Sequence, residues 1–245
     1  MGTARHLSKA PIQEALIDIQ FTPDGAPDVA LIASYLAGAY DGKIGDIWKS
    51  LVHFERNEDG IASQVFPTTK IGKRIDIPSR NQVLQLRENG FTFSRLPPYQ
   101  DWDELKLTGL DVWRSYAVHA LARQVTQVAL RYINALDLPL PFENFSDYLE
   151  AAPPVPAGVP QVIGDFLTRV IIQKGEDLAT ITQLSQGTNP EKTALRVTLD
   201  IEIVSICDLR GDDFIGLTEI LDRQRVYKNE IFFAHLTNKI LEIYE

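Results

Sequence analysis

The sequence predicts an α+β protein with antiparallel sheets and long helices. Three observations favour this class: several short segments alternate in hydrophobicity, turn-forming dipeptides join neighbouring segments, and stretches of helical periodicity separate the runs of strands. A doubly wound fold would instead alternate single strands with single helices. The predicted order is β, α, several β, α, and then again β, α, three β, α, with the second cycle beginning at Gln127.

A strand and a helix open the chain. Apolar residues at odd positions from Ala15 to Phe21 alternate with mostly polar neighbours, and Pro23 ends the strand. From Asp28, which we expect to cap the helix, apolar residues recur at helical spacing as far as Tyr40.

Two hairpins are expected next. Asp59-Gly60 and Asn89-Gly90 each separate two alternating segments, and both dipeptides favour tight turns because their residues tolerate positive φ. Together the segments predict an antiparallel meander. The predicted strands are residues 51–56, 61–66, 74–77, 83–87 and 91–95.

A long helix, a strand and a linker follow the meander. Asp101 and Glu104 resemble a capping box with Asp in place of Ser or Thr, so a helix should run from here to about Arg123. Residues 127–138 then predict a strand that ends at two prolines. Residues 151–160 contain four prolines, too many for a regular element, and are therefore the expected linker.

The segment after the linker predicts a short helix and a strand pair. Apolar residues within 162–167 suggest the helix, and residues 169–174 and 178–184 form strands around Gly175. The linker and these elements precede the most regular part of the chain.

The last strand and helix carry the clearest patterns. Odd positions from Leu195 to Ile203 are all apolar and even positions are all polar, so one face of this strand is buried. Asp212 or Asp213 is expected to cap a long final helix, which Thr237-Asn238 interrupts.

The element order divides the chain into two topologically similar halves, residues 1–125 and 126–245, that we expect to form one compact unit. Each half would be a curved sheet gripping a long helix, by analogy with helix-grip and TATA-box-binding-protein-like folds. Such an analogy concerns architecture and implies no function.

Composition excludes several classes of protein. The 245 residues carry a net charge of −9, which argues against a general nucleic-acid binder, and 44% hydrophobic content is enough for a sizeable core. A single cysteine fits a reducing compartment. Because no apolar run approaches the roughly 18 residues of a spanning helix, we expect a cytoplasmic protein without a membrane partner.

Catalytic and metal-binding motifs are missing from the sequence. It contains no Walker A loop, no G-x-G-x-x-G, no G-x-S-x-G, no C-x-x-C and no H-E-x-x-H. The four histidines are scattered, and Cys207 shares the parity of buried strand positions, so it should pack and not react. We therefore expect no metal and no cofactor, and the catalytic residues, if the protein is an enzyme, are unknown.

A basic segment stands out in this acidic chain. Residues 70–95 carry a local charge of about +4, with only Asp76 and Glu88 as acids. It is either a solvated sheet face whose charges protect an edge or a site for an anion or partner. Its basic residues are Lys70, Lys73, Arg74, Arg80, Arg87 and Arg95.

Several segments in order resemble a sporadically distributed bacterial family of uncharacterised proteins of about 250 residues. They span nearly the whole chain, and none is specific alone. The family has no established activity, so the resemblance implies no catalytic residue, and its patchy distribution suggests defence or mobile-element systems. The segments are Ala10-Pro11-Ile12 with Glu14-Ala15, GFTFSRLPPYQDW (90–102), Trp113 with Tyr116, RYIN (131–134) and KNEIFFAHLTNKILE (228–242).

Six residues within the resembling segments are the candidate binding residues. Arg131 should be substantially buried between the halves, where its charge requires either a carboxylate that ties the halves together or a bound anion. The candidates are Arg95, Tyr99, Trp102, Arg131, Tyr132 and Asn134.

Two functions from different classes follow. The first is a non-enzymatic binding or assembly module of a bacterial system, with a protein partner or self-association, for which exposed aromatic residues would serve. The alternative is a binder of, or an enzyme acting on, a small anionic, nucleotide-like ligand in a cavity between sheet and helix, held by Arg95, Arg131 and Tyr132.

Overall fold

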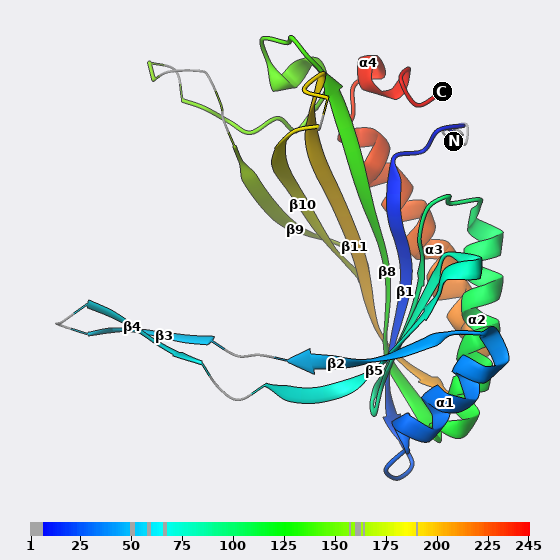
Figure 1. Ribbon diagram of the computed structural model, residues 1–245. Helices are drawn as coiled ribbons and strands as arrows, with labels where there is room; N and C mark the ends of the chain where they lie inside the picture. Colours follow the sequence, from blue (N-terminus) through cyan, green and yellow to red (C-terminus); the bar gives the residue numbers. More distant parts are fainter. Residues whose placement is uncertain are drawn as a thin grey trace.

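The computed structural model describes residues 7–49, 52–57, 60–65, 68–156, 158–159, 163, 165–189 and 191–245. Within these residues the fold is α+β: helices lie on one side of a nine-stranded antiparallel sheet of order β2-β5-β6-β7-β1-β8-β11-β10-β9 (Figure 1). A separate ribbon pairs β3 with β4. The strands are β1 (Ile12–Pro23), β2 (Lys43–Lys49), β3 (Val52–Asn57), β4 (Gly60–Val65), β5 (Thr69–Ile77), β6 (Gln82–Arg87), β7 (Gly90–Arg95), β8 (Ala122–Pro139), β9 (Leu167–Lys174), β10 (Asp177–Thr188) and β11 (Ala194–Arg210).

The helices cover only one face of this sheet. α2 packs on β7 and β1, α3 packs on β11 and β8, and α1 packs on β5. The outer strands β2 and β9 curve away from the helices, and no helix of the described residues lies on the other sheet face (Figure 1). The helices are α1 (Val29–Tyr40), α2 (Trp102–His119), α3 (Phe214–Ala234) and α4 (Asn238–Leu241), with 3-10 turns η1 (Pro78–Arg80) and η2 (Phe145–Asp147).

The alternation of apolar and polar residues in the sequence decides which side of each strand faces the helices. In β1 the odd residues from Ala15 to Phe21 are at most 3% exposed, since they face the helices. In β8 the same face receives Leu130 and Tyr132. The two strands are neighbours at the centre of the sheet, with Leu16 opposite Arg131 on the uncovered face.

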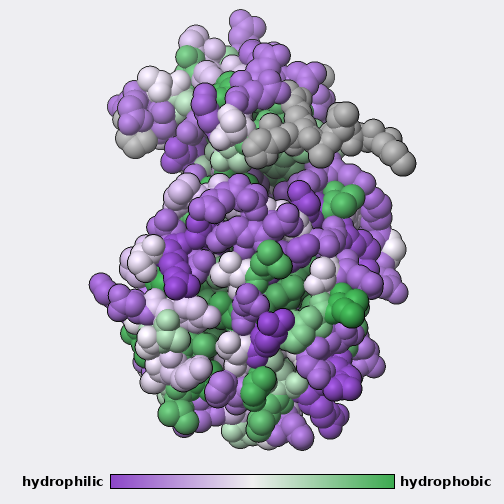
Figure 2. All heavy atoms as spheres, turned by 90° about the vertical axis from the view of Figure 1, so that its right-hand side faces the viewer, coloured by the Kyte–Doolittle hydropathy of each residue, from purple (hydrophilic) through white to green (hydrophobic). Residues whose placement is uncertain are grey.

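Two apolar clusters share this buried face. One lies under α1 and α2, where Trp113 and Tyr116 pack against Phe21 and Phe91 with ring centroids 5.5–6.0 Å apart. The other lies under the C-terminal half of α3 and α4. The outside of the helices carries mostly hydrophilic residues, with hydrophobic ones between them (Figure 2).

The helix caps follow the sequence signals. Asp28, Asp101 and Asp213 each accept a hydrogen bond from the first turn of the following helix. Thr237 is the N-cap residue of α4 and so marks the expected interruption.

The two pairs of strands are confirmed, but neither Gly60 nor Gly90 lies in the turn as predicted. Asn57 pairs with Gly60 and Arg87 pairs with Gly90, so both glycines are the first residues of strands. Gly90 does not have a positive φ. Asp59 lies outside the described residues. The alternation located the strands, whereas the cross-strand register decided the turn.

Two predictions about elements were wrong. A strand, β2, follows α1, although Gly45 and Asp46 interrupt its apolar pattern; it forms an edge of the sheet and needs no buried face. No helix is described at 162–167, where Leu167 instead begins β9 and residues 162 and 164 lie outside the description. The second half therefore has no described counterpart of α1, and the analogy with two-halved folds stays a prediction.

Candidate functional site

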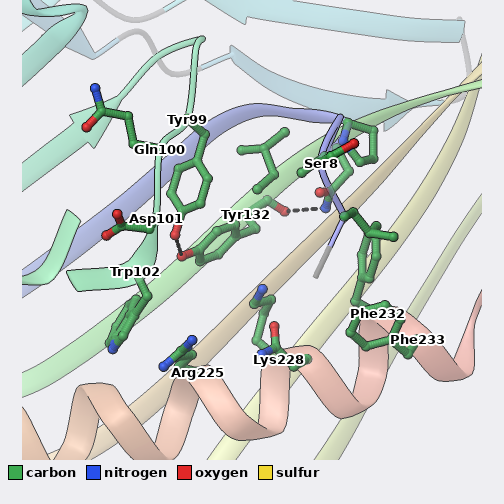
Figure 3. A pocket seen from close by; sticks show the side chains of 16 residues that line it. Ser8, Tyr99, Gln100, Asp101, Trp102, Tyr132, Arg225, Lys228, Phe232 and Phe233 are labelled. Carbon is green, nitrogen blue, oxygen red and sulfur yellow. Dashed lines mark hydrogen bonds between the residues drawn. The ribbon is translucent and has the colours of Figure 1, made fainter. Parts of the chain in front are cut away.

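Four of the six polar candidates line one pocket. Tyr99, Trp102, Tyr132 and Asn134 surround a cavity of about 210 Å³ between the N-terminal segment, the start of α2, β8 and α3 (Figure 3). Segments distant in the sequence supply its walls.

β8 places two of these residues deep in the pocket. Tyr132 and Asn134 share the parity that faces the helices, and each is 2% exposed. The Asn134 amide donates to the carbonyl oxygen of Leu199 at 3.0 Å, which fixes its orientation. The chain just before β1 stays close to this end of β8, where the Ala135 N–H donates to the Pro11 carbonyl oxygen at 2.8 Å, and it forms part of the cavity wall.

The hydroxyl groups of Tyr99 and Tyr132 form a hydrogen-bonded pair. Their oxygens are 2.9 Å apart, and the rings meet edge to face with centroids 5.7 Å apart. Burial raises the pKa of Tyr99 to about 12, and burial also raises the pKa of Tyr132 well above its usual value. Both phenols are therefore protonated at neutral pH. Since the pair uses one hydroxyl proton, the second is available to a ligand.

Lys228 projects from α3 toward β8 (Figure 3). The residue is 9% exposed, and its Nζ lies 3.9 Å from the centroid of the Tyr132 ring. Among the described residues it has no hydrogen bond and no carboxylate partner. Burial, with the nearby charge of Arg225, lowers the pKa of Lys228 from 10.5 to about 7. The site thus holds an amine that is partly neutral at physiological pH.

Arg225 is the second basic residue of the pocket. It lies on the same helix three residues before Lys228, and its guanidinium is 5.6 Å from the Trp102 ring. Asp222, the acid nearest along the helix, instead accepts hydrogen bonds from the Trp102 indole and from Lys106, both at 2.8 Å. In the described part of the chain Arg225 has no ion pair.

Among the described residues that line the pocket, one is acidic and two are basic. The acidic residue is Asp101, whose carboxylate accepts from the Glu104 backbone N–H at 2.8 Å as the cap of α2. The acid therefore has a hydrogen-bond partner, whereas Arg225 and Lys228 have only aromatic rings as partners among the described residues. Phe232, Phe233 and Leu7 supply an apolar part of the wall. Such a mixture suits a small molecule with an anionic end and a short apolar part.

Arg131 lies on the opposite sheet face, away from this pocket. Its guanidinium makes two hydrogen bonds to Asp200 of β11, with Nε–Oδ1 at 2.8 Å and Nη2–Oδ2 at 2.5 Å. The carboxylate alternative is thus correct. The expected burial is only partial, because the side chain is 37% exposed on the sheet face opposite the helices. Both residues belong to the second half, so the pair does not tie the halves together.

Arg95 also lies outside the pocket. It is 6% exposed, donates to the carbonyl oxygen of Arg80, and places Nη1 3.6 Å from a carboxylate oxygen of Glu104. It therefore anchors β7 to the start of α2. The prediction that Arg95, Arg131 and Tyr132 hold one ligand together is wrong, because the three side chains lie in three different environments.

Most bases of the segment 70–95 pair with acids that lie elsewhere in the sequence. Lys70 and Lys73 both pair with Asp46, at 2.9 and 2.7 Å. Arg87 pairs with Asp18 at 2.6 Å. Since β2 was not predicted, the Asp46 contact could not be foreseen. The remaining partners are Asp76 for Arg74, Glu104 for Arg95 and the ring of Tyr40 for Arg80.

A hollow of about 400 Å³ on the uncovered sheet face is the second candidate site. It is lined by Asp18, Arg87 and Arg131, together with neutral polar side chains and Glu202. Both of its arginines are already paired with carboxylates. Because these charges are compensated within the protein, the Lys228 pocket is the better candidate for a ligand.

Metal and membrane sites are not evident in the described part of the chain. There, no group of three or more His, Cys, Asp or Glu side chains could hold a metal ion. Cys207 packs beside the core, and burial raises the pKa of its thiol to about 11, so it is a weak nucleophile. Over the same residues, none of the helices combines the length and the apolar character that membrane crossing requires.

Lys228 and Arg225 were missed by reasoning from sequence. One signal was present: position 228 lies seven residues after Leu221 and three before Ile231, within the predicted apolar stripe of the last helix. A lysine at such a position is unusual, because lysine is almost never fully buried without a partner.

Comparisons with protein-family models, with curated proteins and with solved structures find no match for this chain. The geometry of the pocket therefore carries the functional conclusion.

Proposed function

We propose that the protein binds a small anionic ligand in the Lys228 pocket. The observation that carries this proposal is the buried Lys228 amine, which has no carboxylate partner among the described residues. A charged amine is costly to bury alone, and a bound anion would compensate it. Arg225 at the same pocket offers the ligand a second cation.

The size of the pocket restricts the ligand. A cavity of about 210 Å³ is smaller than the roughly 300–1,000 Å³ of sites for drug-sized ligands. It suits a short carboxylic acid or a small phosphate compound and is too small to enclose a whole nucleotide. The hydroxyl pair of Tyr99 and Tyr132 and the Asn134 amide would orient the polar end.

The broader hypothesis, a binding or assembly module of a bacterial system, stays a prediction. The small-ligand alternative is favoured because it explains why uncompensated bases gather at one cavity. A protein partner on an exposed aromatic residue such as Trp48, which is 57% exposed, would not require Lys228 to be buried.

Thermal unfolding with inorganic phosphate and with lactate tests the proposal. Either anion should raise the Tm of the wild type by mass action, by an amount equivalent to about 2.7 kcal/mol at a hundredfold excess over Kd. Lys228→Met should abolish this shift while raising the Tm of the ligand-free protein. Lys49→Met, which removes a charge from the exposed edge strand β2, is the matched control and should keep the shift.

The opposite pattern would refute the proposal. If neither anion stabilises the wild type, or if both stabilise Lys228→Met as strongly as the Lys49→Met control, the pocket does not bind small anions through Lys228.

A further inference from the structure

Several lysines in the described part of the chain contact a carboxylate, and the Lys228 amine differs from them. Lys70, Lys73 and Lys106 each have Nζ within 3.0 Å of an Asp oxygen. Lys228 has no such partner, and its Nζ lies over the Tyr132 ring at the cavity wall. A carboxylate would hold a lysine in its protonated form, whereas an aromatic face does so less strongly. The structure thus keeps this amine accessible to the cavity and able to lose its proton.

We propose that Lys228 forms an imine with the carbonyl carbon of a small 2-oxo carboxylic acid bound in this pocket. The inference rests on the proposed function, since the carboxylate of the substrate is the anion that the pocket binds. It goes further because it makes the pocket a covalent site and Lys228 a nucleophile.

Arg225 would hold the carboxylate of the substrate. Its guanidinium is at the cavity, lies 5.6 Å from the centroid of the Trp102 ring and has no ion pair within the described residues. A planar guanidinium binds a carboxylate through two hydrogen bonds. Because Arg225 and Lys228 lie on one helix three residues apart, an acid held by the first brings its adjacent carbonyl toward the second.

The reaction balances without an oxidant or a further reactant. The neutral Lys228 nitrogen attacks the carbonyl carbon, the N–C bond forms, and a proton moves from nitrogen to the oxygen to give a carbinolamine. Loss of this hydroxyl group as water, after it gains a proton, leaves the C=N bond. The hydroxyl pair of Tyr99 and Tyr132 lines the same cavity and would relay these protons, since both phenols retain their protons at neutral pH.

The pH dependence separates imine formation from simple anion binding. The charged and titratable groups that face Lys228 are Arg225 on α3, Tyr132 on β8, and Tyr99 and Asp101 before α2. Burial sets the pKa of Lys228 at about 7, so the neutral, nucleophilic amine becomes dominant above this pH. Imine formation should therefore increase from pH 6 to pH 8. Binding of an anion that cannot react, which favours the ammonium form, should weaken over the same range.

Reductive trapping tests the inference. The full-length protein is incubated with pyruvate or glyoxylate and sodium cyanoborohydride, and digested with trypsin. Trypsin cleaves after Arg225 and Lys228, so a reduced adduct on Lys228 prevents cleavage and joins residues 226–228 to 229–239. The exposed Lys239 is the internal control. We expect modification of Lys228 to exceed that of Lys239 by about tenfold or more, because burial lowers the pKa of the Lys228 amine and the pocket holds the acid beside it.

Two comparisons make the result interpretable. Lactate has the shape and charge of pyruvate without its carbonyl group, so it should protect Lys228 from pyruvate and form no adduct. Lys228→Arg keeps the positive charge and cannot form an imine, so it should retain stabilisation by lactate and lose the adduct.

The two proposals fail in different ways. If lactate stabilises the wild type but neither pyruvate nor glyoxylate labels Lys228 above Lys239, the pocket binds anions and imine formation is refuted. If lactate and phosphate have no effect and no adduct forms, both proposals are refuted. Labelling of Lys228 that decreases from pH 6 to pH 8 would also contradict a neutral amine as the nucleophile.

Discussion

Replacement of Lys228 by Met is expected to stabilise the ligand-free protein and to remove part of its pH dependence. The folded protein holds the pKa of Lys228 at about 7, below its ordinary value of 10.5, because burial disfavours the charge. Between these values the unfolded chain binds more protons than the folded one. The free energy of unfolding of the wild type therefore rises with pH through this window, and the penalty is largest below pH 7.

The size of the effect follows from the pKa and the contact. At pH 7 the penalty is roughly 4 kcal/mol, because one pKa unit corresponds to about 1.4 kcal/mol. Loss of the Lys228 contact with the Tyr132 ring, 3.9 Å from Nζ to centroid, offsets this by up to about 2 kcal/mol. Met keeps an unbranched apolar chain in the same space. We therefore expect a net gain of about 2 kcal/mol at pH 7.

Urea unfolding at pH 7 and pH 9 measures both parts of this prediction. Over this interval the wild type should gain roughly 2 kcal/mol more than Lys228→Met, since the variant lacks the titrating amine. Other groups titrate equally in both proteins and cancel in the difference. Equal pH dependence of the two proteins, or a loss of stability at pH 7 in the variant, would show that Lys228 is charged and well compensated, and the reasoning about the pocket would fail.

Two further substitutions test contacts outside the pocket. Arg131→Met should lower the free energy of unfolding in urea by about 1–2 kcal/mol, because it leaves Asp200, whose side chain is 18% exposed, without its partner. The partial exposure of Arg131 limits this loss. An unchanged midpoint would contradict a contribution from this pair. In Gly90→Ala the new Cβ would lie 2.6 Å from Arg87 Nε and displace it from Asp18. We expect a loss of about 1 kcal/mol that largely disappears in an Arg87→Met background, and additive effects would refute the coupling.

Much of the local structure could be predicted from the sequence. The strand Leu195–Ile203 lies inside β11, and its alternation is sufficient because one face of a strand meets the core and the other meets solvent. Asp28, Asp101 and Asp213 cap their helices through hydrogen bonds to residues two or three positions away. Both features depend on neighbours in the chain, so a pattern of residues is enough to reveal them.

The pairing of charges was decided by the tertiary structure. The bases of segment 70–95 looked like a free positive patch, but Lys73 finds Asp46 on β2 and Arg87 finds Asp18 on β1. Arg131 was expected to be substantially buried, and it is partly buried on the sheet face opposite the described helices. Local charge counts fail here because strands far apart in sequence lie about 5 Å apart in a sheet.

The candidate site depends on both the local sequence and the tertiary structure. By itself the sequence determined which residues carry usable polar groups, and the parity of β8 already placed Tyr132 and Asn134 on one face. Only the fold brings that face to the N-terminal segment, to Tyr99 and to Lys228 on α3, and so creates a cavity. The chemistry of Lys228 depends on this assembly, because an amine keeps its ordinary pKa in water and loses its proton more readily only where other segments exclude water and offer no carboxylate.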